Sequence, residues 1–140
     1  MALAEHAEDA MFATVAYLVA DENLGMISVW SPTFALQIFD LIKLHQNEIA
    51  DVLEQGHWNS RQLNFMKAPR NAKQASRLKA LNFEDHHSWE KLWPKLCLIS
   101  SWDTASSRLW ARKLQQIVPH VAFEGKGLWA TEGVVTIPYD

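Results

Sequence analysis

The sequence predicts an α/β fold, a partial and mostly parallel sheet flanked by helices. Short β-branched runs alternate with longer stretches whose apolar residues recur every three or four positions. The run 26–30 passes at once into a Ser-Pro helix start, which is half of a β-α-β unit. The run 96–100 is almost continuously apolar, as strands covered on both faces are.

Two helices around one strand are expected in the first half of the chain. Apolar spacing predicts a helix over 5–20, and a strand over 26–30 follows it. Ser31 can cap the next helix, and Pro32 suits the first helical position, where a missing N–H costs nothing. The apolar stripe then predicts one long helix that Gly56 ends.

The second half is expected to hold shorter elements after an irregular polar stretch. They are, in order, a basic helix over 69–81, a turn capped by Ser88, a strand over 96–100, a helix capped by Asp103 or Thr104, and strands over 121–123 and 134–137. In the last helix, five apolar residues are expected to face inward: Leu109, Trp110, Leu114, Ile117 and Val118. Cys97 falls in a strand expected to be buried, so we interpret it as a small apolar residue rather than a nucleophile.

Composition narrows the class of protein. The 140 residues are 49% hydrophobic and 21% charged, which fits one globular domain or part of a larger one. The net charge of −3 shows no basic excess, which argues against a nucleic-acid binder. A single cysteine excludes an internal disulfide, and no apolar run approaches the roughly 20 residues of a membrane span. We therefore expect a soluble, cytoplasmic protein without nucleic-acid or membrane partners.

Three loops follow the predicted strands, at 31–32, 100–107 and 125–133, and ligands bind at the carboxyl ends of strands in such sheets. In the last loop Thr131 lies beside Glu132, a hydroxyl for a phosphate oxygen and a carboxylate for a hard cation. The alternative is a surface turn with a solvated glutamate. The loop 100–107 carries five hydroxyls, which can bind an anion or simply cap the next helix.

Other patterns favour ordinary structural roles. Lys126 stands between two glycines, but it precedes a strand-like stretch and not a helix, so it does not fit a phosphate-binding loop and we expect a solvated turn lysine. The segment 84–87 (Glu-Asp-His-His) could ligate a metal, yet adjacent residues rarely point at one ion, and a hydrated loop is favoured. No Gly-x-Ser-x-Gly elbow marks a nucleophilic serine.

Four segments in this order resemble a known family: 27–34 (Ile-Ser-Val-Trp-Ser-Pro-Thr-Phe), 92–96 (Leu-Trp-Pro-Lys-Leu), 100–102 (Ser-Ser-Trp) and 125–133 (Gly-Lys-Gly-Leu-Trp-Ala-Thr-Glu-Gly). Together they are similar to bacterial members of the auxin-responsive-promoter type acyl-acid-amido synthetases, which belong to the adenylate-forming superfamily. The resemblance extends over roughly residues 10–140. It implies that the chain is part of the large N-terminal domain of such an enzyme.

The resemblance also implies an activity. These ATP-dependent ligases convert a carboxylic acid to an acyl-adenylate and pass the acyl group to an amine, usually that of an amino acid. By this analogy Thr131 contacts the α-phosphate and Glu132 binds Mg²⁺. The residues implied to border the nucleotide are Ser101, Thr104, Ser106, Leu128 and Trp129, and those implied to border the acyl group are Trp30, Phe34 and Trp102.

The sequence departs from the family pattern in three places. The Ser/Thr/Gly-rich phosphate loop is expected upstream of residue 1, and the ribose-binding Asp and the mobile C-terminal domain are expected after residue 140. Leu128 stands where many relatives place a tyrosine against adenine. The expected protein is therefore one partial domain over 1–140, inactive alone. The alternative is a non-catalytic α/β module that binds a partner through exposed tryptophans, of which the chain has seven in all.

Overall fold

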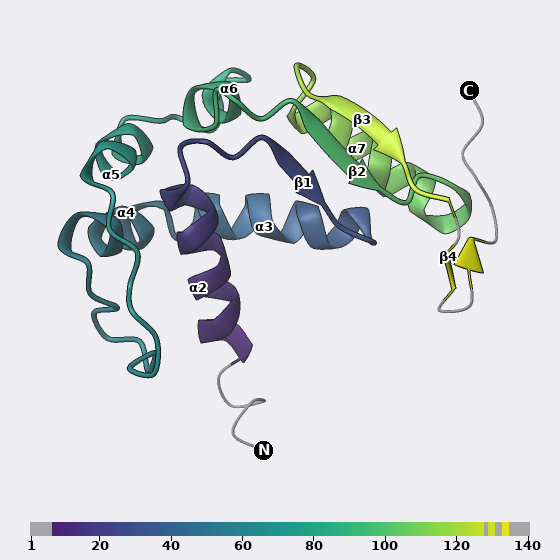
Figure 1. Ribbon diagram of the computed structural model, residues 1–140. Coiled ribbons are helices and arrows are strands. Elements are labelled where there is room, and N and C mark those ends of the chain that lie inside the picture. Colours follow the sequence, from purple (N-terminus) through teal and green to yellow (C-terminus); the bar gives the residue numbers. More distant parts are fainter. Residues whose placement is uncertain (1–6, 128, 131–132, 135–140) are drawn as a thin grey trace.

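The computed structural model describes residues 7–127, 129–130 and 133–134, and it describes side chains as far as Gly127. Its centre is a parallel sheet of three strands, β1 (Met26–Ser28), β2 (Leu98–Ser101) and β3 (Ala122–Gly125), in the order β1-β2-β3 (Figure 1). The α/β fold predicted from the sequence is confirmed.

Helices account for most of the remaining described structure. They are α2 (Ala7–Ala20), α3 (Pro32–Leu44), α4 (Gln46–Gln55), α5 (Ala72–Lys79), α6 (Ser88–Leu92), the 3₁₀ turn η1 (Ala105–Ser107) and α7 (Arg108–Ile117). Helices α3 and α7 contact each other on one side of the sheet, while α2, α4 and α5 gather at the other end of the molecule (Figure 1). None of the described helices is long and apolar enough to span a membrane.

The two faces of the sheet differ in burial. Ile27 and Ile99 are opposite each other in the strand register and are both buried, and Phe123 continues that row on β3. Side chains alternate between faces along a strand, and on the opposite face Met26 and Glu124 are exposed. Parallel sheets are normally covered on both faces, so the described part of the chain covers only one face of this sheet.

The predicted long helix over 32–55 is two helices. His45, at φ −107° and ψ 22°, separates α3 from α4. Its ring packs edge-to-face on Phe12, with centroids 5.6 Å apart, and its Nδ1 lies 3.1 Å from Glu48 Oε2. The side chain of Gln46 donates to the carbonyls of Leu78 and Leu81, which ties the start of α4 to α5. The apolar periodicity continues unbroken through His45, so these tertiary contacts, and not the local sequence, account for the change of direction between α3 and α4.

Gly56 ends α4 in the left-handed region at φ 74°, as the sequence predicts. Its N–H donates to Val52 O at 2.7 Å, and a Cβ added here would lie 3.3 Å from Arg70 Cδ. Because an L-residue pays about 1–2 kcal/mol for this conformation, Gly56→Ala is expected to lower the free energy of unfolding by about 1 kcal/mol or more. Urea denaturation at neutral pH measures the loss, and an unchanged midpoint would contradict it.

Several local expectations are wrong. Ser88 is the first residue of α6 and not its cap, since its hydroxyl donates to the carbonyl of Asn82. Thr104 precedes η1 without a side-chain capping bond, and Ser107 before α7 makes none either. Leu109 is 71% exposed because α7 buries a narrow face, that of Ala111 and Leu114.

Two more residues lie nearer the surface than the sequence predicts. Trp110 is exposed on α7. Cys97 is also exposed, since it lies just before the first residue of β2 and is not inside a covered strand. Its backbone N–H and its thiol both donate to Gly25 O.

Beyond β3 the backbone forms a short antiparallel pair, β4 (Trp129–Ala130) and β5 (Gly133–Val134). The strand predicted over 134–137 is thus observed at its first residue, and 135–137 lie outside the described residues.

Candidate functional site at the carboxyl edge of the sheet

The loops that follow β1, β2 and β3 meet at one edge of the sheet, as parallel strands require. Hydrogen bonds continue past the strand ends, with Trp102 N donating to Trp30 O at 3.0 Å and Lys126 N donating to Ser101 O at 2.9 Å. Trp30 and Trp102 are 72 residues apart in sequence (102 − 30), and Ser101 and Lys126 are 25 apart (126 − 101), yet each pair is adjacent in space. The edge that the sequence predicts as the ligand position is assembled in the structure.

Of the five hydroxyls in the loop 100–107, not all are free to bind a ligand. Ser101 is fully buried, and its Oγ donates to Trp30 O at 3.1 Å, so it ties the end of β2 to the end of β1. Thr104 and Ser106 are exposed at η1 and accessible to a ligand. Ser101 therefore holds the ends of β1 and β2 together, while the hydroxyls of Thr104 and Ser106 face solvent.

Two indoles lie side by side at this edge. The rings of Trp30 and Trp102 are 5.7 Å apart with an interplanar angle of 49°. Trp30 is 54% exposed, whereas Trp102 is half-buried. Among the described atoms, the buried Nε1 of Trp102 has no hydrogen-bond partner. Because a buried N–H donor without a partner costs free energy, this atom marks a place where an acceptor would be stabilising.

Lys126 belongs to the same edge. Its Nζ donates to Ser28 Oγ at 2.8 Å and lies 5.1 Å from the centroid of the Trp30 ring. The solvated turn lysine expected from the sequence is therefore wrong, since the side chain is half-buried and directed across β2 toward β1. The sequence could have indicated a site role for Lys126 because it directly follows a strand. Its contact with Ser28, 98 residues away, depends on the register of the sheet.

Asp103 lies against the end of β3. A Cβ added to Gly125 would be 2.5 Å from Asp103 Oδ2, so this carboxylate needs the space that glycine leaves. Gly125 opposes Ser101 in the strand register. Asp103 therefore lies beside Gly125, the residue before Lys126, but the ion pairs of the described residues do not include one between Asp103 and Lys126.

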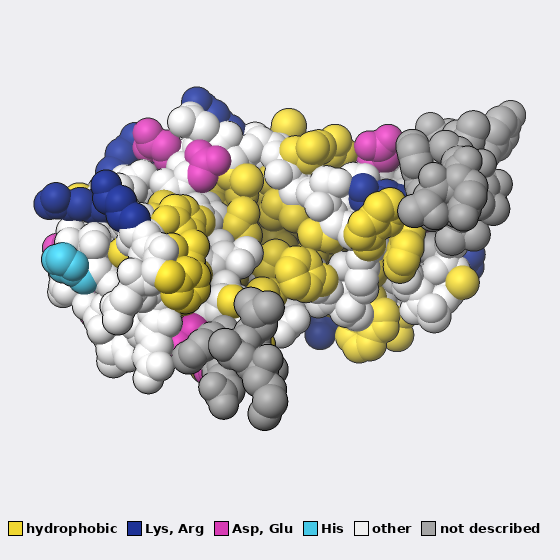
Figure 2. All heavy atoms as spheres, turned by 60° about the horizontal axis from the view of Figure 1, so that its bottom comes forward, with side chains coloured by type: hydrophobic (Ala, Val, Ile, Leu, Met, Phe, Trp, Pro, Cys, Tyr) yellow, Lys and Arg dark blue, Asp and Glu magenta, His cyan; other side chains and the backbone are white. Residues whose placement is uncertain are grey.

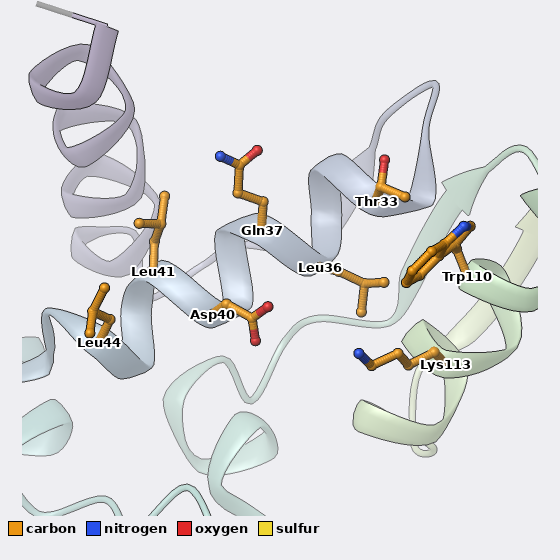
Figure 3. Close-up of a pocket in the computed structure, with 8 residues that line it drawn as sticks. All are labelled: Thr33, Leu36, Gln37, Asp40, Leu41, Leu44, Trp110 and Lys113. Atoms are coloured by element: carbon orange, nitrogen blue, oxygen red, sulfur yellow. The ribbon is translucent and has the colours of Figure 1, made fainter.

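The start of α3 borders the edge and a surface hollow. Ser31 Oγ accepts from Thr33 N at 3.3 Å, which confirms the predicted cap. Thr33 also lines a hollow of about 330 Å³ between α3 and α7, where Trp110 and Lys113 point toward α3 (Figure 3). The other lining residues are Leu36, Gln37, Asp40, Leu41 and Leu44.

A second hollow, of about 400 Å³, lies between α2 and α3. Phe34 lines it together with Met11 and Phe12. The structure therefore directs Phe34 toward α2, whereas Trp30 and Trp102 contact each other at the sheet edge. Hydrophobic side chains gather across the middle of this side of the molecule (Figure 2).

Part of the predicted site lies outside the described residues. Thr131, Glu132 and Leu128 are not described, and Trp129 is described only as backbone in β4. In the described part of the chain, no group of three His, Cys, Asp or Glu side chains could hold a metal ion. In the segment 84–87, Asp85 accepts from the backbone of His87 and from Lys91, and these bonds hold its pKa below the usual range.

These features define a class, an α/β protein in which three parallel strands end at one edge, the usual position of a ligand in such sheets. The model of the GH3 family N-terminal domain matches residues 1–123. The chain belongs to the GH3 family, in its N-terminal domain. No curated protein sequence matches it significantly.

Solved structures show the same fold. One, AtGH3.15 acyl acid amido synthetase in complex with 2,4-DB, superposes with a TM-score of 0.67 at 16% identity over 85% of this chain. Another, GH3.15 acyl acid amido synthetase, gives 0.69 at 15% identity over 89% of this chain. The matches cover 23% and 25% of those chains, so this chain spans about a quarter of their length.

Proposed function

We propose that this chain forms part of the adenylating domain of an ATP-dependent acyl-acid-amido synthetase of the bacterial branch. The reaction joins a carboxylic acid to AMP with release of pyrophosphate, and an amino acid amine then displaces AMP to form an amide. The observation that carries the proposal is the match to the family's N-terminal domain over residues 1–123. The assembled carboxyl edge is where such a fold binds its ligands.

Each part of the edge has a role in this reaction. Thr131 would donate to the α-phosphate, and Glu132 would hold Mg²⁺, since a hydroxyl donates to phosphate oxygens and hard cations prefer carboxylate oxygens. Both residues follow β3 in sequence. The acid and ATP are both anionic, so a metal and fixed donors must offset their mutual repulsion.

The nucleotide and the acid use different surfaces of the edge. Thr104 and Ser106 are the exposed hydroxyls available to the nucleotide, with Leu128 and Trp129 following β3. Trp30 and Trp102 present the apolar surface that an acyl group would contact. Phe34 would contact the acyl group only if that group extends into the hollow between α2 and α3.

The domain over 1–140 is proposed to be partial. The sheet face that carries Met26 and Glu124 is exposed in the described structure, although parallel sheets are normally covered on both faces. A reducing cytoplasm fits ATP use and the single Cys97. Alone, the 140-residue chain is expected not to catalyse ATP–pyrophosphate exchange, because it supplies only one wall of the site.

The test is ATP–pyrophosphate exchange in a complete synthetase that carries this segment. Glu132→Ala is expected to lower exchange about 10²–10³-fold, the size of effect of one group that stabilises developing charge. Glu90→Ala on α6 is the control, since its carboxylate is at the surface and, among the described residues, pairs with His87. Unchanged exchange in Glu132→Ala would remove the metal role. Exchange by the 140-residue chain itself would show that the chain holds a complete site.

One observation favours a second candidate function, a non-catalytic binding module. Trp110 is exposed on α7 and lines the hollow beside α3 together with Leu36 and Leu44 (Figure 3). Against it, Trp58, Trp89 and Trp93 are all buried in the core. Binding of ATP to the chain with shifts confined to the carboxyl edge would favour the synthetase. Binding of a protein that shifts only Trp110 and its neighbours would favour the module.

A further inference from the structure

We propose that Lys126 binds the carboxylate of the acid and that Trp30 and Trp102 contact the acid's apolar body. This inference rests on the proposed function for what the ligand is. It goes beyond that function by naming the residue that binds the carboxylate. The sequence pattern predicted only a solvated lysine in a turn at this position.

The first observation is the position of the ammonium. Lys126 Nζ is held by Ser28 Oγ at 2.8 Å, and it lies 5.1 Å from the centre of the Trp30 ring. A lysine ammonium has three donors, so one bond to Ser28 leaves two for a ligand. The half-buried stem of Lys126 crosses the sheet edge, and the ammonium is therefore fixed at the edge instead of moving freely in water.

The second observation is charge. Elsewhere in the described chain, lysines beside acidic side chains form ion pairs of 2.6–2.7 Å, as Lys73, Lys79 and Lys91 do. Lys126 forms no such pair with any described carboxylate, although Asp103 and Glu124 belong to the same edge. Among the described residues, the ammonium of Lys126 therefore has no carboxylate partner and can pair with an anionic ligand.

The third observation distinguishes an acid from a phosphate. The ammonium lies over the ring of Trp30, which is 54% exposed, and the ring of Trp102 is 5.7 Å from that of Trp30. A carboxylic acid with an apolar body can use the indole surface and the charge together. Inorganic phosphate has no apolar part to place against Trp30, so this pairing of groups favours an apolar carboxylate over inorganic phosphate.

The experiment is an NMR titration of the ¹⁵N-labelled 140-residue chain, which detects binding into the millimolar range. The probes are phenylacetate, its neutral amide phenylacetamide and inorganic phosphate. Phenylacetate is expected to shift the indole signals of Trp30 and Trp102 and to bind about tenfold more tightly than the amide, the effect of one charge-assisted hydrogen bond. Equal binding of acid and amide, or no binding of the acid, would overturn the inference.

Three variants locate the effect. Lys126→Gln is expected to lose the tenfold preference, and Lys126→Arg to keep most of it, since the charge remains. Lys113→Gln is the matched control, because Lys113 lies 5.9 Å from the ring of exposed Trp110 but away from the edge. Native amide dispersion in each spectrum verifies folding. An unchanged preference in Lys126→Gln contradicts the role of Lys126. Phosphate that binds more tightly than phenylacetate, and depends on Lys126, assigns the site to phosphate instead.

The outcomes separate this inference from the proposed function. A complete synthetase whose ATP–pyrophosphate exchange has the same KM for the acid in Lys126→Gln as in the wild type would retain the function and lose the inference. Lys126-dependent binding of phenylacetate, together with Glu132→Ala exchange at the wild-type rate, would retain the inference and remove the proposed metal role.

Discussion

Phe39→Ala is expected to lower the free energy of unfolding by about 3–5 kcal/mol. Phe39 is fully buried on α3, and its ring meets Trp89 edge-on at 4.5 Å and Trp93 at 6.1 Å. The two indoles stack on each other at 5.9 Å, so the truncated side chain would leave a cavity between a helix and an aromatic pair that cannot collapse easily.

Urea denaturation followed by far-UV circular dichroism measures this loss. Phe65→Ala is the matched control, because Phe65 is 75% exposed and its removal should change stability by no more than about 0.5 kcal/mol. Equal losses in the two variants would show that the packing of Phe39 does not stabilise the fold. The measurement also tests whether α6, which carries Trp89, belongs to the same cooperative unit as α3.

Arg61→Ala is expected to lower the free energy of unfolding by about 2 kcal/mol, between the values for exposed and buried ion pairs. Arg61 Nε donates to Glu48 Oε1 at 2.7 Å and Nη1 to Asp9 Oδ1 at 2.9 Å. Its guanidinium also lies 3.7 Å from the centre of the Phe12 ring. The side chain is only 12% exposed, so its loss leaves the carboxylates of Asp9 and Glu48 without their shared cation.

This loss should depend on pH. The hydrogen bond from Arg61 holds the pKa of Glu48 below its ordinary value, despite partial burial, which acts the other way. A lowered folded pKa stabilises the protein above the unfolded pKa, and this contribution disappears as pH falls through the folded pKa. The difference between wild type and Arg61→Ala should therefore be largest near neutral pH and shrink below the ordinary glutamate pKa.

Chemical denaturation at several pH values from about 7 to 3 measures the trend, since this window spans the ordinary glutamate pKa. Lys73→Ala is the comparison, because the pair that Lys73 forms with Glu22 is largely exposed, and its loss should lower stability less than the loss of Arg61. A difference between Arg61→Ala and the wild type that stays constant across this range would mean that packing on Phe12, and not the ion pair, is the main contribution.

Local sequence signals predicted the ends of several elements. Ser31 and Pro32 mark the start of α3, and Gly56 marks the end of α4, because capping depends on residues within one turn of each other. The break at His45 was not predictable in this way. The apolar periodicity continues through it, and the cause is contact with Phe12 and α5, which are distant in sequence.

Burial was harder to predict than element type. The apolar residues around Cys97 predicted a covered strand, yet Cys97 is exposed because β2 begins one residue later, at Leu98. Trp89 and Trp110 have the same side chain, but one is in the core and the other is at the surface. The neighbours that decide between them come from other elements, so composition alone could not separate the two.

The sequence by itself determined the α/β class, the order of strands and helices, and the expectation that chemistry lies after the strands. These follow from periodicity and capping, which act between residues close in the chain. Only the tertiary structure decided which side chains meet at the edge. Lys126 reaches Ser28 across 98 residues, and Trp102 meets Trp30, because the parallel register of β1, β2 and β3 aligns their carboxyl ends. Neighbouring strands of a parallel sheet are joined by long crossover connections, so the residues that meet at its edge come from segments far apart in the chain.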